Sequence, residues 1–542
     1  MNKRRYKGKI GSILTILTLL VIPAFVIIQP VSSTPTAYYV STAGNDITGD
    51  GSSTNPWRSI QKGVNMIGPG DTLIVKSGRY TEEVQISNKN GTSENWITIK
   101  AETKGTVVVD ANGFTNTWAG IFRLDASSYI RISGFICRNI TSHGIFICGY
   151  GNHDIRIDNN TIRNCSSSGI YCYRGINDSS HWIQNVVIDY NYMTELNNNN
   201  SGTYWSQEGL SFSGVRGFNV HHNRIEKCNK ETVDLKGGTG YGSFHHNIIN
   251  NTHYTTYQGK TNWGSSLFGL YIDGYWKTAQ NISIYNNLIY GNTTGIWCNT
   301  GEQTTGLSRN ITLYNNIINL SQHNSEKPDG LIIGGYNRHI YNICIYSNTI
   351  YTQAGRPIAT ATPEKYFHNI NIKNNIFANE NYYQLQFTNI NFTSPQFHLS
   401  NNLYYRYGNK DHTEWRDGDN QYESTAIKKD PKFISRPTNL HLTTSSPAID
   451  NGTSTLIPSF DFDDTSRPKG NGYDIGAYEY VGVSQDWDIN EDGICNLLDL
   501  ILISEHFGEI GTPGWIREDV DNNGEIQMLD LFFVSNYYGE SW

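Results

Sequence analysis

One short pattern recurs nine times through the middle of the chain and limits what the chain can fold into. Each copy has alternating apolar residues, an asparagine and a second apolar pair, as in IRIDNNTI ending at Ile162 and ITLYNNII ending at Ile318. The aligned asparagines, 24 to 40 residues apart, are Asn160, Asn191, Asn223, Asn247, Asn287, Asn316, Asn348, Asn375 and Asn402. Repetition at this spacing indicates a solenoid.

The pattern inside each copy has a period of two, which is typical of a strand with one buried face. Stacked coils bury such faces in one continuous core, and asparagine suits the turn because it tolerates left-handed backbone and bonds to the next asparagine in a ladder. A sandwich or a propeller would group several strands per unit. The sequence therefore predicts an all-β parallel β-helix over residues 38–480.

The two ends of the solenoid give further expectations. An amphipathic stretch, Trp57 to Ile67, predicts a helix that covers the exposed strand edges at the N-terminal end. Residues 430–480, which end in DIGAYEY, are interpreted as the closing coil. The opening YYVS…GPGDTLIVKSGRYTEEV resembles pectate-lyase-like members of the right-handed parallel β-helix family of secreted polysaccharide lyases and hydrolases. The resemblance implies a right-handed helix that degrades a polysaccharide.

The N-terminus is typical of an export signal. Basic residues from Lys3 to Lys9 precede an apolar run, Ile10 to Ile28, and small residues follow. Residues 1–33 are predicted to be a signal peptide, with an uncleaved anchor as the alternative, so we expect a secreted or cell-surface protein with no other membrane segment. A net charge of −8 excludes a basic nucleic-acid footprint, and an anionic substrate would need a local positive site.

The eight cysteines match no metal spacing, and Cys172 and Cys298 fall at inward strand positions, where core packing is expected. After a linker, residues 481–486, two 12-residue loops 31 residues apart close the chain, DINEDGICNLLD and DVDNNGEIQMLD. Oxygen-bearing side chains stand at the positions that hold Ca²⁺ in such loops, and a glycine allows the sharp turn. The predicted ligands of two calcium ions are Asp488, Asn490, Asp492, Asn496, Asp499, Asp519, Asp521, Asn523, Gln527 and Asp530.

Each loop runs into an apolar helical stretch, DLILISEHFGE or DLFFVSNYYGE. Residues 487–542 resemble type I dockerins. The resemblance implies a small all-α calcium-binding domain that docks to a cohesin-type protein.

A second repeated strand places chemistry on one face of the predicted solenoid. Its copies include GIYCY at Gly169, GLSFS at Gly209, TVDLK at Thr232, GLYID at Gly269 and GIWCN at Gly295. Alternation assigns apolar side chains to the inside, namely Leu210, Phe212, Val233, Leu235, Leu270, Ile272, Ile296 and Cys298. The outward positions hold Ser211, Ser213, Asp234, Lys236, Tyr271, Asp273, Trp297 and Asn299.

Neighbouring strands lie about 4.8 Å apart, so Glu208, Glu231, Asp234, Lys236 and Asp273 should gather on the exterior; we call them the acidic wall. Clustered acids need a cation, a proton or a substrate to compensate them. Aromatic and basic side chains that flank the wall are candidates for sugar binding, namely Tyr171, Tyr173, Arg174, Tyr271 and Trp297. An ordinary solvated face is the alternative.

The segment ETVDLK, Glu231 to Lys236, resembles an element of chondroitinase-B-like and alginate lyases. The resemblance implies that Glu231 binds a further Ca²⁺ at the wall and that Lys236, with a lowered pKa, removes the proton next to a uronate carboxylate. Residues 200–320 also resemble disaggregatase-related β-helix proteins of methanogenic archaea. That resemblance implies a chondroitin-like matrix of uronates and amino sugars as the substrate.

Two alternatives to elimination stay open. Asp234 and Asp273 are one coil and two residues apart, about 8 Å, which suits the acid and base of an inverting hydrolase; Lys236 would then bind a substrate carboxylate. The other alternative is a glycan-binding adhesin tethered through its dockerin-like domain. His221, His222, His245 and His246 lie at the asparagine turn, where decoration of the ladder is favoured over catalysis.

Overall fold

The computed structural model describes residues 35–114, 119–175, 181–197, 208–251, 268–274, 277–291, 293–301, 306–320, 328–380, 385–387, 395–407, 423–455, 457–481, 487–490, 494–512, 516–521 and 523–540, and the statements below refer to these. The predicted signal peptide, most of the linker and Asp492 lie outside them. No helix in this part of the chain is long and apolar enough to cross a membrane.

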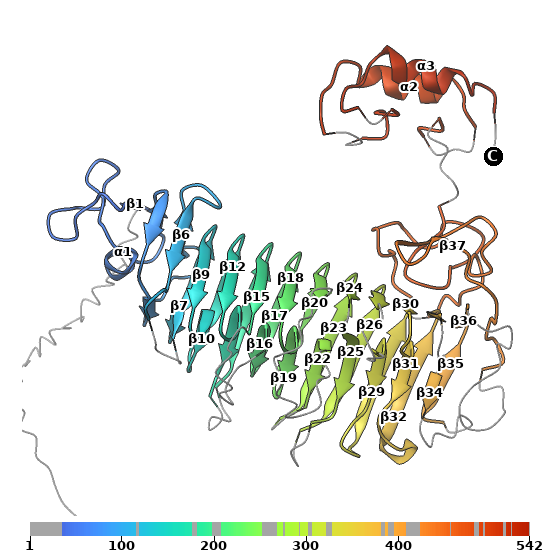
Figure 1. Ribbon diagram of the computed structural model, residues 1–542, viewed down its shortest axis with the longest axis horizontal. Helices are drawn as coiled ribbons and strands as arrows, with labels where there is room; N and C mark the ends of the chain where they lie inside the picture. Colours follow the sequence, from blue (N-terminus) through green and yellow to red (C-terminus); the bar gives the residue numbers. More distant parts are fainter. Residues whose placement is uncertain are drawn as a thin grey trace, which may run out of the picture. The chain divides into compact units, whose positions relative to one another are not determined.

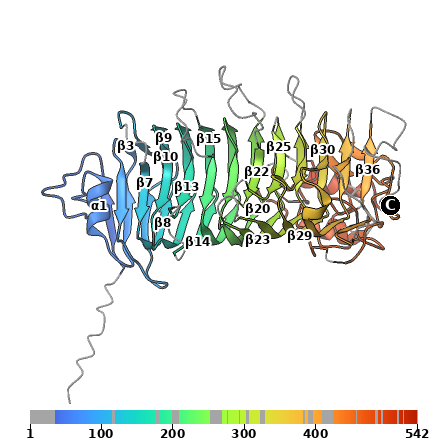
Figure 2. The same ribbon diagram turned by 90° about the horizontal axis from the view of Figure 1, so that it is seen from below.

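The central architecture is a parallel β-helix built from three long parallel sheets, each taking one strand per coil, as Figure 1 and Figure 2 show. The first sheet contains β1 (Ala37–Val40), β2 (Thr72–Val75), β5 (Ile97–Ala101), β8 (Ser128–Ser133), β11 (His153–Asp158), β14 (Ile183–Asp189), β17 (Val215–His221), β20 (Gly240–His245), β23 (Ala279–Tyr285), β26 (Ser308–Tyr314), β29 (Ile340–Tyr346), β32 (Phe367–Lys373) and β35 (Phe397–Ser400).

The second sheet follows the asparagine turn and contains β3 (Gly78–Tyr80), β6 (Val107–Asp110), β9 (Ile136–Ile140), β12 (Thr161–Cys165), β15 (Tyr192–Leu196), β18 (Arg224–Cys228), β21 (Ile248–Asn251), β24 (Leu288–Gly291), β27 (Ile317–Leu320), β30 (Thr349–Thr352), β33 (Ile376–Asn379) and β36 (Leu403–Arg406). The third sheet contains β4 (Val84–Ser87), β7 (Gly120–Asp125), β10 (His143–Cys148), β13 (Ile170–Tyr173), β16 (Leu210–Ser213), β19 (Val233–Lys236), β22 (Phe268–Asp273), β25 (Thr294–Asn299), β28 (Leu331–Ile333), β31 (Ile358–Thr360) and β34 (Leu385–Phe387). A 3-10 turn, η1 (Glu364–Tyr366), precedes β32.

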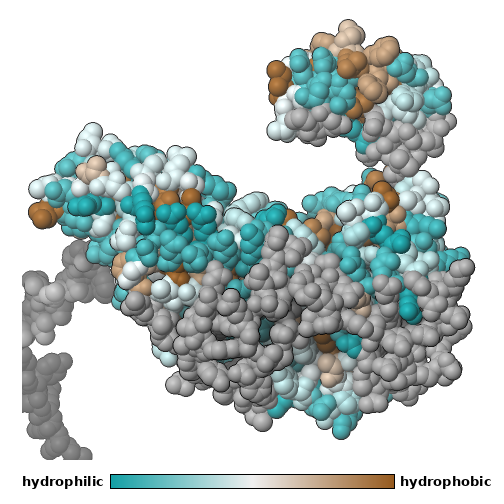
Figure 3. Space-filling view, viewed as in Figure 1, coloured by the Kyte–Doolittle hydropathy of each residue, from teal (hydrophilic) through white to brown (hydrophobic). Residues whose placement is uncertain are grey.

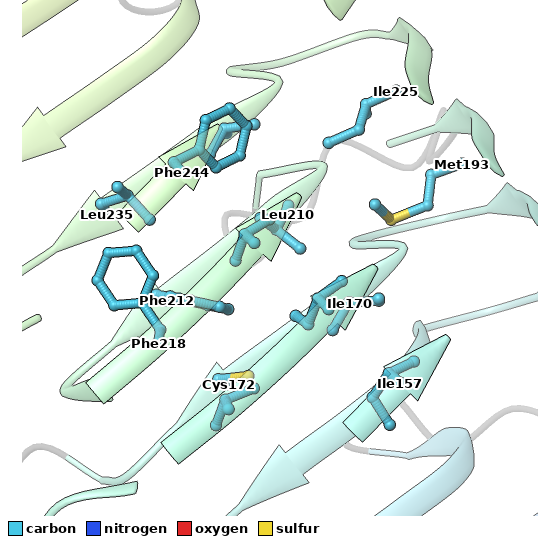
Figure 4. Packing of buried hydrophobic residues seen from close by; sticks show 14 of the residues in the cluster. Ile157, Ile170, Cys172, Met193, Leu210, Phe212, Phe218, Ile225, Leu235 and Phe244 are labelled. Carbon is cyan, nitrogen blue, oxygen red and sulfur yellow. The ribbon is translucent and has the colours of Figure 1, made fainter. Parts of the chain in front are cut away.

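The core is one continuous column of apolar side chains inside the three sheets. Figure 4 shows part of it, with Phe212, Leu235 and Phe244 from successive coils. All the inward residues predicted on the third sheet are buried, Cys172 and Cys298 among them. All eight cysteines lie in the described part and are free thiols. The prediction of a stacked-coil core with core-packed cysteines is confirmed.

The nine repeated asparagines form the predicted ladder between the first and second sheets, and all nine are buried. Each backbone N–H and each side-chain Nδ2 donates to the Oδ1 of the next asparagine, as Asn316 does to Asn348 at 2.9 Å. The Nδ2 also donates to a carbonyl of the preceding coil, such as that of Ile284. At the C-terminal end, Asn402 donates instead to the carboxylate of Glu423, at 2.8 and 2.9 Å. The ladder therefore satisfies polar groups that would be costly to bury alone.

Stacked rings run along the outside of the same turn, on the outward face of the first sheet. His221 stacks on His245, His245 on Tyr285 and Tyr285 on Tyr314, with ring centres 5.1, 4.5 and 4.7 Å apart. His222 and His246 form a parallel pair beside them. The histidines thus decorate the ladder, as the sequence favoured.

The N-terminal coil carries a short helix, α1 (Ile60–Met66), within the segment where one was predicted. Ser59 begins the helix, because its side chain accepts a hydrogen bond from the Lys62 N–H at 3.2 Å. The helix buries Ile60 and Val64 in the column that the strands share.

The interpretation of residues 430–480 as a closing coil is wrong. Only the short stretch 423–427 continues the stacking, through a parallel bridge of Ile427 to Leu403. The rest, with its hairpin β37 (Phe433–Ser435) and β38 (Asn439–Leu442), returns along the outside of earlier coils. Its apolar side chains, Leu440, Leu442, Ala448, Ile475 and Ala477, form a second core with Ile317, Tyr351, Ile376, Ala378 and Leu403. We call this returning segment, residues 430–480, the strap. Hydrogen bonds such as that from Asn374 Nδ2 to the Thr453 carbonyl, 2.9 Å long, hold the strap to the coils.

The C-terminal module contains two helices, α2 (Leu497–Glu505) and α3 (Met528–Ser535), each preceded by one of the acidic loops. Asp499 and Asp530 take part in matching capping boxes. The two helices contact each other over a small core that includes Trp487, Ile503, Ile526 and Val534. The internal duplication of the sequence is therefore matched by a duplicated loop-helix unit.

Candidate active site

Five neighbouring strands of the third sheet, β13, β16, β19, β22 and β25, position the predicted site (Figure 1). Their register aligns two outward rows across successive coils. The first row holds Tyr171, Ser211, Asp234, Tyr271 and Trp297, and the second holds Tyr173, Ser213, Lys236, Asp273 and Asn299. The structure brings the predicted wall residues together in the expected order.

The acidic wall faces outward but is largely shielded from solvent. Its residues point away from the core, yet Glu208, Asp234 and Asp273 are buried, and Glu231 and Lys236 are half-buried. The outward placement agrees with the prediction, but the burial of these carboxyl groups differs from the alternative of a solvated face. Burial strengthens every electrostatic interaction within the wall, because less water screens the charges.

Glu208 is the charge centre of the wall. Its carboxylate contacts Lys230 Nζ at 2.7 Å and Lys236 Nζ at 2.5 Å, and it accepts a hydrogen bond from the Ser211 hydroxyl at 2.8 Å. Burial alone would raise the pKa of Glu208, but the charges of Lys230 and Lys236 outweigh burial and hold that pKa well below its ordinary value. Glu208 is therefore an ionised carboxylate at neutral pH.

Asp234 lies beside Glu208 and behaves in the opposite way. Its carboxyl oxygen Oδ2 is 3.3 Å from Lys236 Nζ, while its Oδ1 has no hydrogen-bond partner among the described residues. Burial raises the pKa of Asp234 well above its ordinary value, and the Glu208 charge adds to this, although Lys236 opposes it. Burial also raises the pKa of Glu231. The wall thus holds neighbouring carboxyl groups whose pKa values are shifted in opposite directions.

The expectation of a lowered pKa for Lys236 is wrong. Burial alone would lower the pKa of Lys236, but Glu208 and Asp234 outweigh burial and raise that pKa well above its ordinary value. An ammonium group held between two carboxyl groups keeps its proton. In the arrangement described here Lys236 is a charged donor.

The flanking aromatic residues pack against one another beside the wall. Tyr171 stacks between Phe146 and Tyr173, with ring centres 5.3 and 5.4 Å away. Tyr271 stacks on Phe268 and accepts a hydrogen bond from the Asn299 amide. The indole of Trp297 meets the ring edges of both Phe268 and Tyr271, and its Nε1 donates to the Gly334 carbonyl at 2.7 Å.

Arg174 stands at the end of β13, outside the acidic wall. Its guanidinium lies 4.2 Å from the ring centre of Trp182, and the guanidinium of Arg216 lies 3.8 Å from the same ring. The Lys277 ammonium is 5.3 Å from it. These three cations and Trp182, called the cationic cluster, follow the strands that carry the wall. They form a local concentration of positive charge, of which Arg174 is the buried member.

Three polar residues of the site were not singled out as site residues from the sequence. Lys230 precedes the repeated strand, so alternation gives no face for it. His143 lies one coil before Tyr171, 4.9 Å from its ring, and burial lowers the pKa of its imidazole to about 3. Asn299 ends the outward row on β25. The register of the third sheet could have found His143 and Asn299, whereas Lys230 gave no signal.

The predicted calcium ligands divide between two places. In the second C-terminal loop, Asp519, Asp521 and Asp530 bring carboxylate oxygens within 4.8 Å of one another, which suits Ca²⁺. In the first loop Asp488 and Asp499 are buried in matching positions. The described wall residues do not form such a group, because the ammonium groups of Lys230 and Lys236 lie between the carboxylates. Calcium at the wall stays a prediction, and no step below uses it.

Known proteins share the fold of this chain. Residues 38–186 match the family described as "Pel9A-like, right handed beta helix region". The crystal structure of pectate lyase Pel9A is 16% identical with a TM-score of 0.50, over 82% of this chain and 97% of that one. The complex of XylC with xylose is 12% identical with a TM-score of 0.52, over 82% and 98%. Comparison with curated protein sequences gave no match. These similarities show a parallel β-helix.

Proposed function

We propose that this protein is a polysaccharide-degrading enzyme that acts outside the cytoplasm on an anionic glycan. Its reaction centre is the acidic wall on the outward face of the third sheet, and the cationic cluster binds acidic sugars next to it. The two solved structures with the same fold are named for a pectate lyase and for a complex with xylose, which supports a carbohydrate substrate. A glycan of uronates and amino sugars fits both the acids and the cations.

The observation that carries the proposal is the pair of carboxyl groups around Lys236. Two lysines lower the pKa of Glu208 and burial raises the pKa of Asp234, although both carboxyl groups touch the same ammonium group. Glycoside cleavage needs a carboxyl group that can donate its proton, and enzymes raise the pKa of that group through burial and a neighbouring negative charge, as Glu208 and burial do for Asp234. A solvated charged face has no reason to bury its acids.

Hydrolysis with inversion is the reaction that this arrangement supports best. Asp234 donates its proton to the glycosidic oxygen as the bond from that oxygen to the anomeric carbon breaks. Asp273, one coil further and about 8 Å away, removes a proton from the water that forms the new bond from the opposite side. Lys236 and Glu208 hold the acid in place, and the half-buried rings of Tyr271 and Trp297 offer aromatic surface for sugar rings, whereas Tyr171 is covered by its neighbours.

Elimination from a uronate is the second candidate, and the central position of Lys236 favours it. A base there would remove the proton next to the sugar carboxylate, and the glycosidic oxygen would leave from the neighbouring carbon to give an unsaturated product. The raised pKa of Lys236 opposes this role. Glu208 would first have to release the ammonium group.

The deciding experiment measures new reducing ends and the ultraviolet absorbance of unsaturated products on chondroitin-like and pectic polymers. Reducing ends without absorbance are expected, with a loss of about 10²- to 10⁴-fold in Asp234→Asn. Lys236→Met removes the ammonium group and keeps the chain length. Rising absorbance that disappears in this variant would establish elimination instead. If no polymer gives new ends but glycans still bind, the adhesin alternative replaces both.

We also propose that the C-terminal module binds two calcium ions and docks to a cohesin-type protein. The described helices expose large apolar side chains, namely Leu497, Leu498, Ile501, Met528, Leu529, Phe532 and Phe533, and Figure 3 shows brown atoms gathered on this module. Exposed apolar surface of this extent marks interaction sites. Pull-down of a purified cohesin in calcium and in chelator tests the proposal, which fails if binding is equal in both.

A further inference from the structure

A groove separate from the wall lies on the outward face of the first sheet, and it is called here the aromatic groove. Its volume is about 620 Å³, and its floor comes from β23, β26 and β29. Residues 457–460 and 464 of the C-terminal strap form the opposite side. The groove therefore exists only because the strap returns along the coils, and no proposed step of the reaction uses it.

The floor offers the same kind of side chain on successive coils. Tyr285, Tyr314 and Tyr346 are register partners on three neighbouring strands, and all three line the groove. Tyr285 and Tyr314 stack at 4.7 Å with an angle of 3° between their planes. Among the described residues no ring contact joins Tyr314 to Tyr346, so the column of stacked rings ends inside the groove. Phe460 stands at the lip and is 54% exposed.

Polar groups accompany these rings. Asn286 and Asn315 line the groove and are 5% and 1% exposed, and their Nδ2 groups donate to the Asp461 and Phe460 carbonyls at 3.2 and 2.6 Å. Their Oδ1 atoms accept no hydrogen bond from the described residues. Both Oδ1 atoms are themselves buried, so these amides serve the groove by holding the strap to its floor through their Nδ2 groups.

The charges of the groove select the ligand. No lysine or arginine is among its described lining residues, and the one acidic residue, Asp464, lies 3.6 Å from His246. An anionic sugar would find repulsion here and no partner. A chain of uncharged sugars would find the face of Tyr314 that no described ring covers and the exposed ring of Phe460 for stacking. Because the groove crosses three successive coils along the helix axis, a linear chain fits better than a single small molecule.

We propose that the aromatic groove is a second glycan-binding site, which takes an uncharged or N-acetylated stretch of a polysaccharide chain. The site is distinct from the acidic wall, since the two occupy outward faces of different sheets. It would hold the protein on its polymer while the wall acts on acidic sugars, which is a gain in effective concentration.

The test is calorimetric titration of the full-length protein with cellohexaose and chitohexaose, and with an oligogalacturonate as the anionic comparison. At least one uncharged hexamer should bind, and Phe460→Ala and Tyr314→Ala should each weaken that binding at least tenfold. Phe460 is exposed, so its replacement tests the site even if Tyr314→Ala misfolds. The matched control is Tyr190→Asn, a 50% exposed aromatic residue at the same turn outside the groove, at a left-handed position where other coils carry asparagine.

Failure of the two proposals is distinguishable. Polymer cleavage measured on the same variants reports on the wall, and both groove variants should cleave short acidic oligosaccharides at the parent rate. The groove proposal is overturned if neither hexamer binds the parent, if both groove variants bind as the parent does, or if Tyr190→Asn loses as much affinity as they do.

Discussion

At the scale of single residues, Asp234 in the acidic wall is a carboxyl group whose burial lowers the stability of the folded protein. Asp234 is buried, and its pKa is higher in the folded state than in the unfolded state. At any pH between these two pKa values, the folded protein keeps a proton on Asp234 that the unfolded protein has released. Stability falls as pH rises wherever the folded state binds more protons. The buried acid therefore destabilises the fold at neutral and alkaline pH.

Asp234→Asn should accordingly stabilise the protein while it lowers activity. We expect the free energy of unfolding to rise by about 0.5–2 kcal/mol at pH 8. The gain should shrink toward zero below about pH 4, where Asp234 of the parent is protonated in both the folded and the unfolded state. The urea midpoint measured across this pH range checks the prediction. Ser213→Asn, on the second outward row, is the control, and equal effects in both variants would contradict the assignment to the carboxyl group.

Glu208→Gln should act in the opposite direction. The lowered pKa of Glu208 means that its stabilising contribution is present at neutral pH and is lost only as pH falls through that lowered value. We expect the free energy of unfolding to fall by about 3 kcal/mol at pH 7. This is at the lower end of the range for breaking a buried ion pair, because Lys230 and Lys236 are half-buried. The loss should persist in mild acid. An unfolding midpoint equal to that of the parent would show that the lysines find other partners.

The sequence predicts where these side chains stand better than it predicts their protonation. Alternation along each strand and stacking of coils fix which residues share a row, so Asp234, Lys236 and Asp273 lie as expected. The pKa of Lys236 depends on which neighbours lie within contact distance and on burial, which a pattern of period two does not contain. Lys230 lies outside any regular strand, and for that reason the second partner of Glu208 was missed.

At the scale of elements, the asparagine ladder is a structural unit that crosses every coil from Asn160 to Glu423. Asn316→Ala should remove one rung and leave the N–H groups of Asn287 and the Ile284 carbonyl without their partner. We expect a loss of about 1–3 kcal/mol, measured as a shift of the urea midpoint. Asn371→Ala, whose side chain bonds at the surface of β32, should change stability little. Equal losses would refute a special role for the ladder.

The strap shows what a repeat pattern leaves undetermined at this scale. Residues 430–480 contain few strands. Their apolar residues are compatible either with one more coil stacked on the solenoid or with a segment that packs on the outside of earlier coils. The outcome depends on apolar groups such as Ile376 and Leu403 that the outer face of the second sheet presents. Their sequence positions look like ordinary strand positions. The nine aligned asparagines, by contrast, determine the stacking because each one needs the next.

At the scale of the whole molecule, calcium should affect the C-terminal module and leave the β-helix unchanged. The carboxylates of Asp519, Asp521 and Asp530 repel one another without a cation. Adding calcium at 100 times its dissociation constant should stabilise the module by about 2.7 kcal/mol, seen as a calcium-dependent transition in calorimetry. Asp530→Ala should lower this gain, whereas Asp463→Ala, an exposed acid of the strap, should not. If the unfolding transition of the module has the same midpoint temperature with and without chelator, calcium binding is contradicted.

Glu423 also sets the point at which the asparagine ladder ends. Every asparagine of the ladder donates to the next one toward the C-terminal end. The last asparagine of such a stack therefore has two donors without an acceptor, unless another coil or another group accepts from them. A carboxylate accepts both donors of Asn402 and, having no N–H of its own, passes none on. Glu423 is thus a chain terminator in the polymer chemist's sense, because it leaves no side-chain donor of the ladder for a further coil.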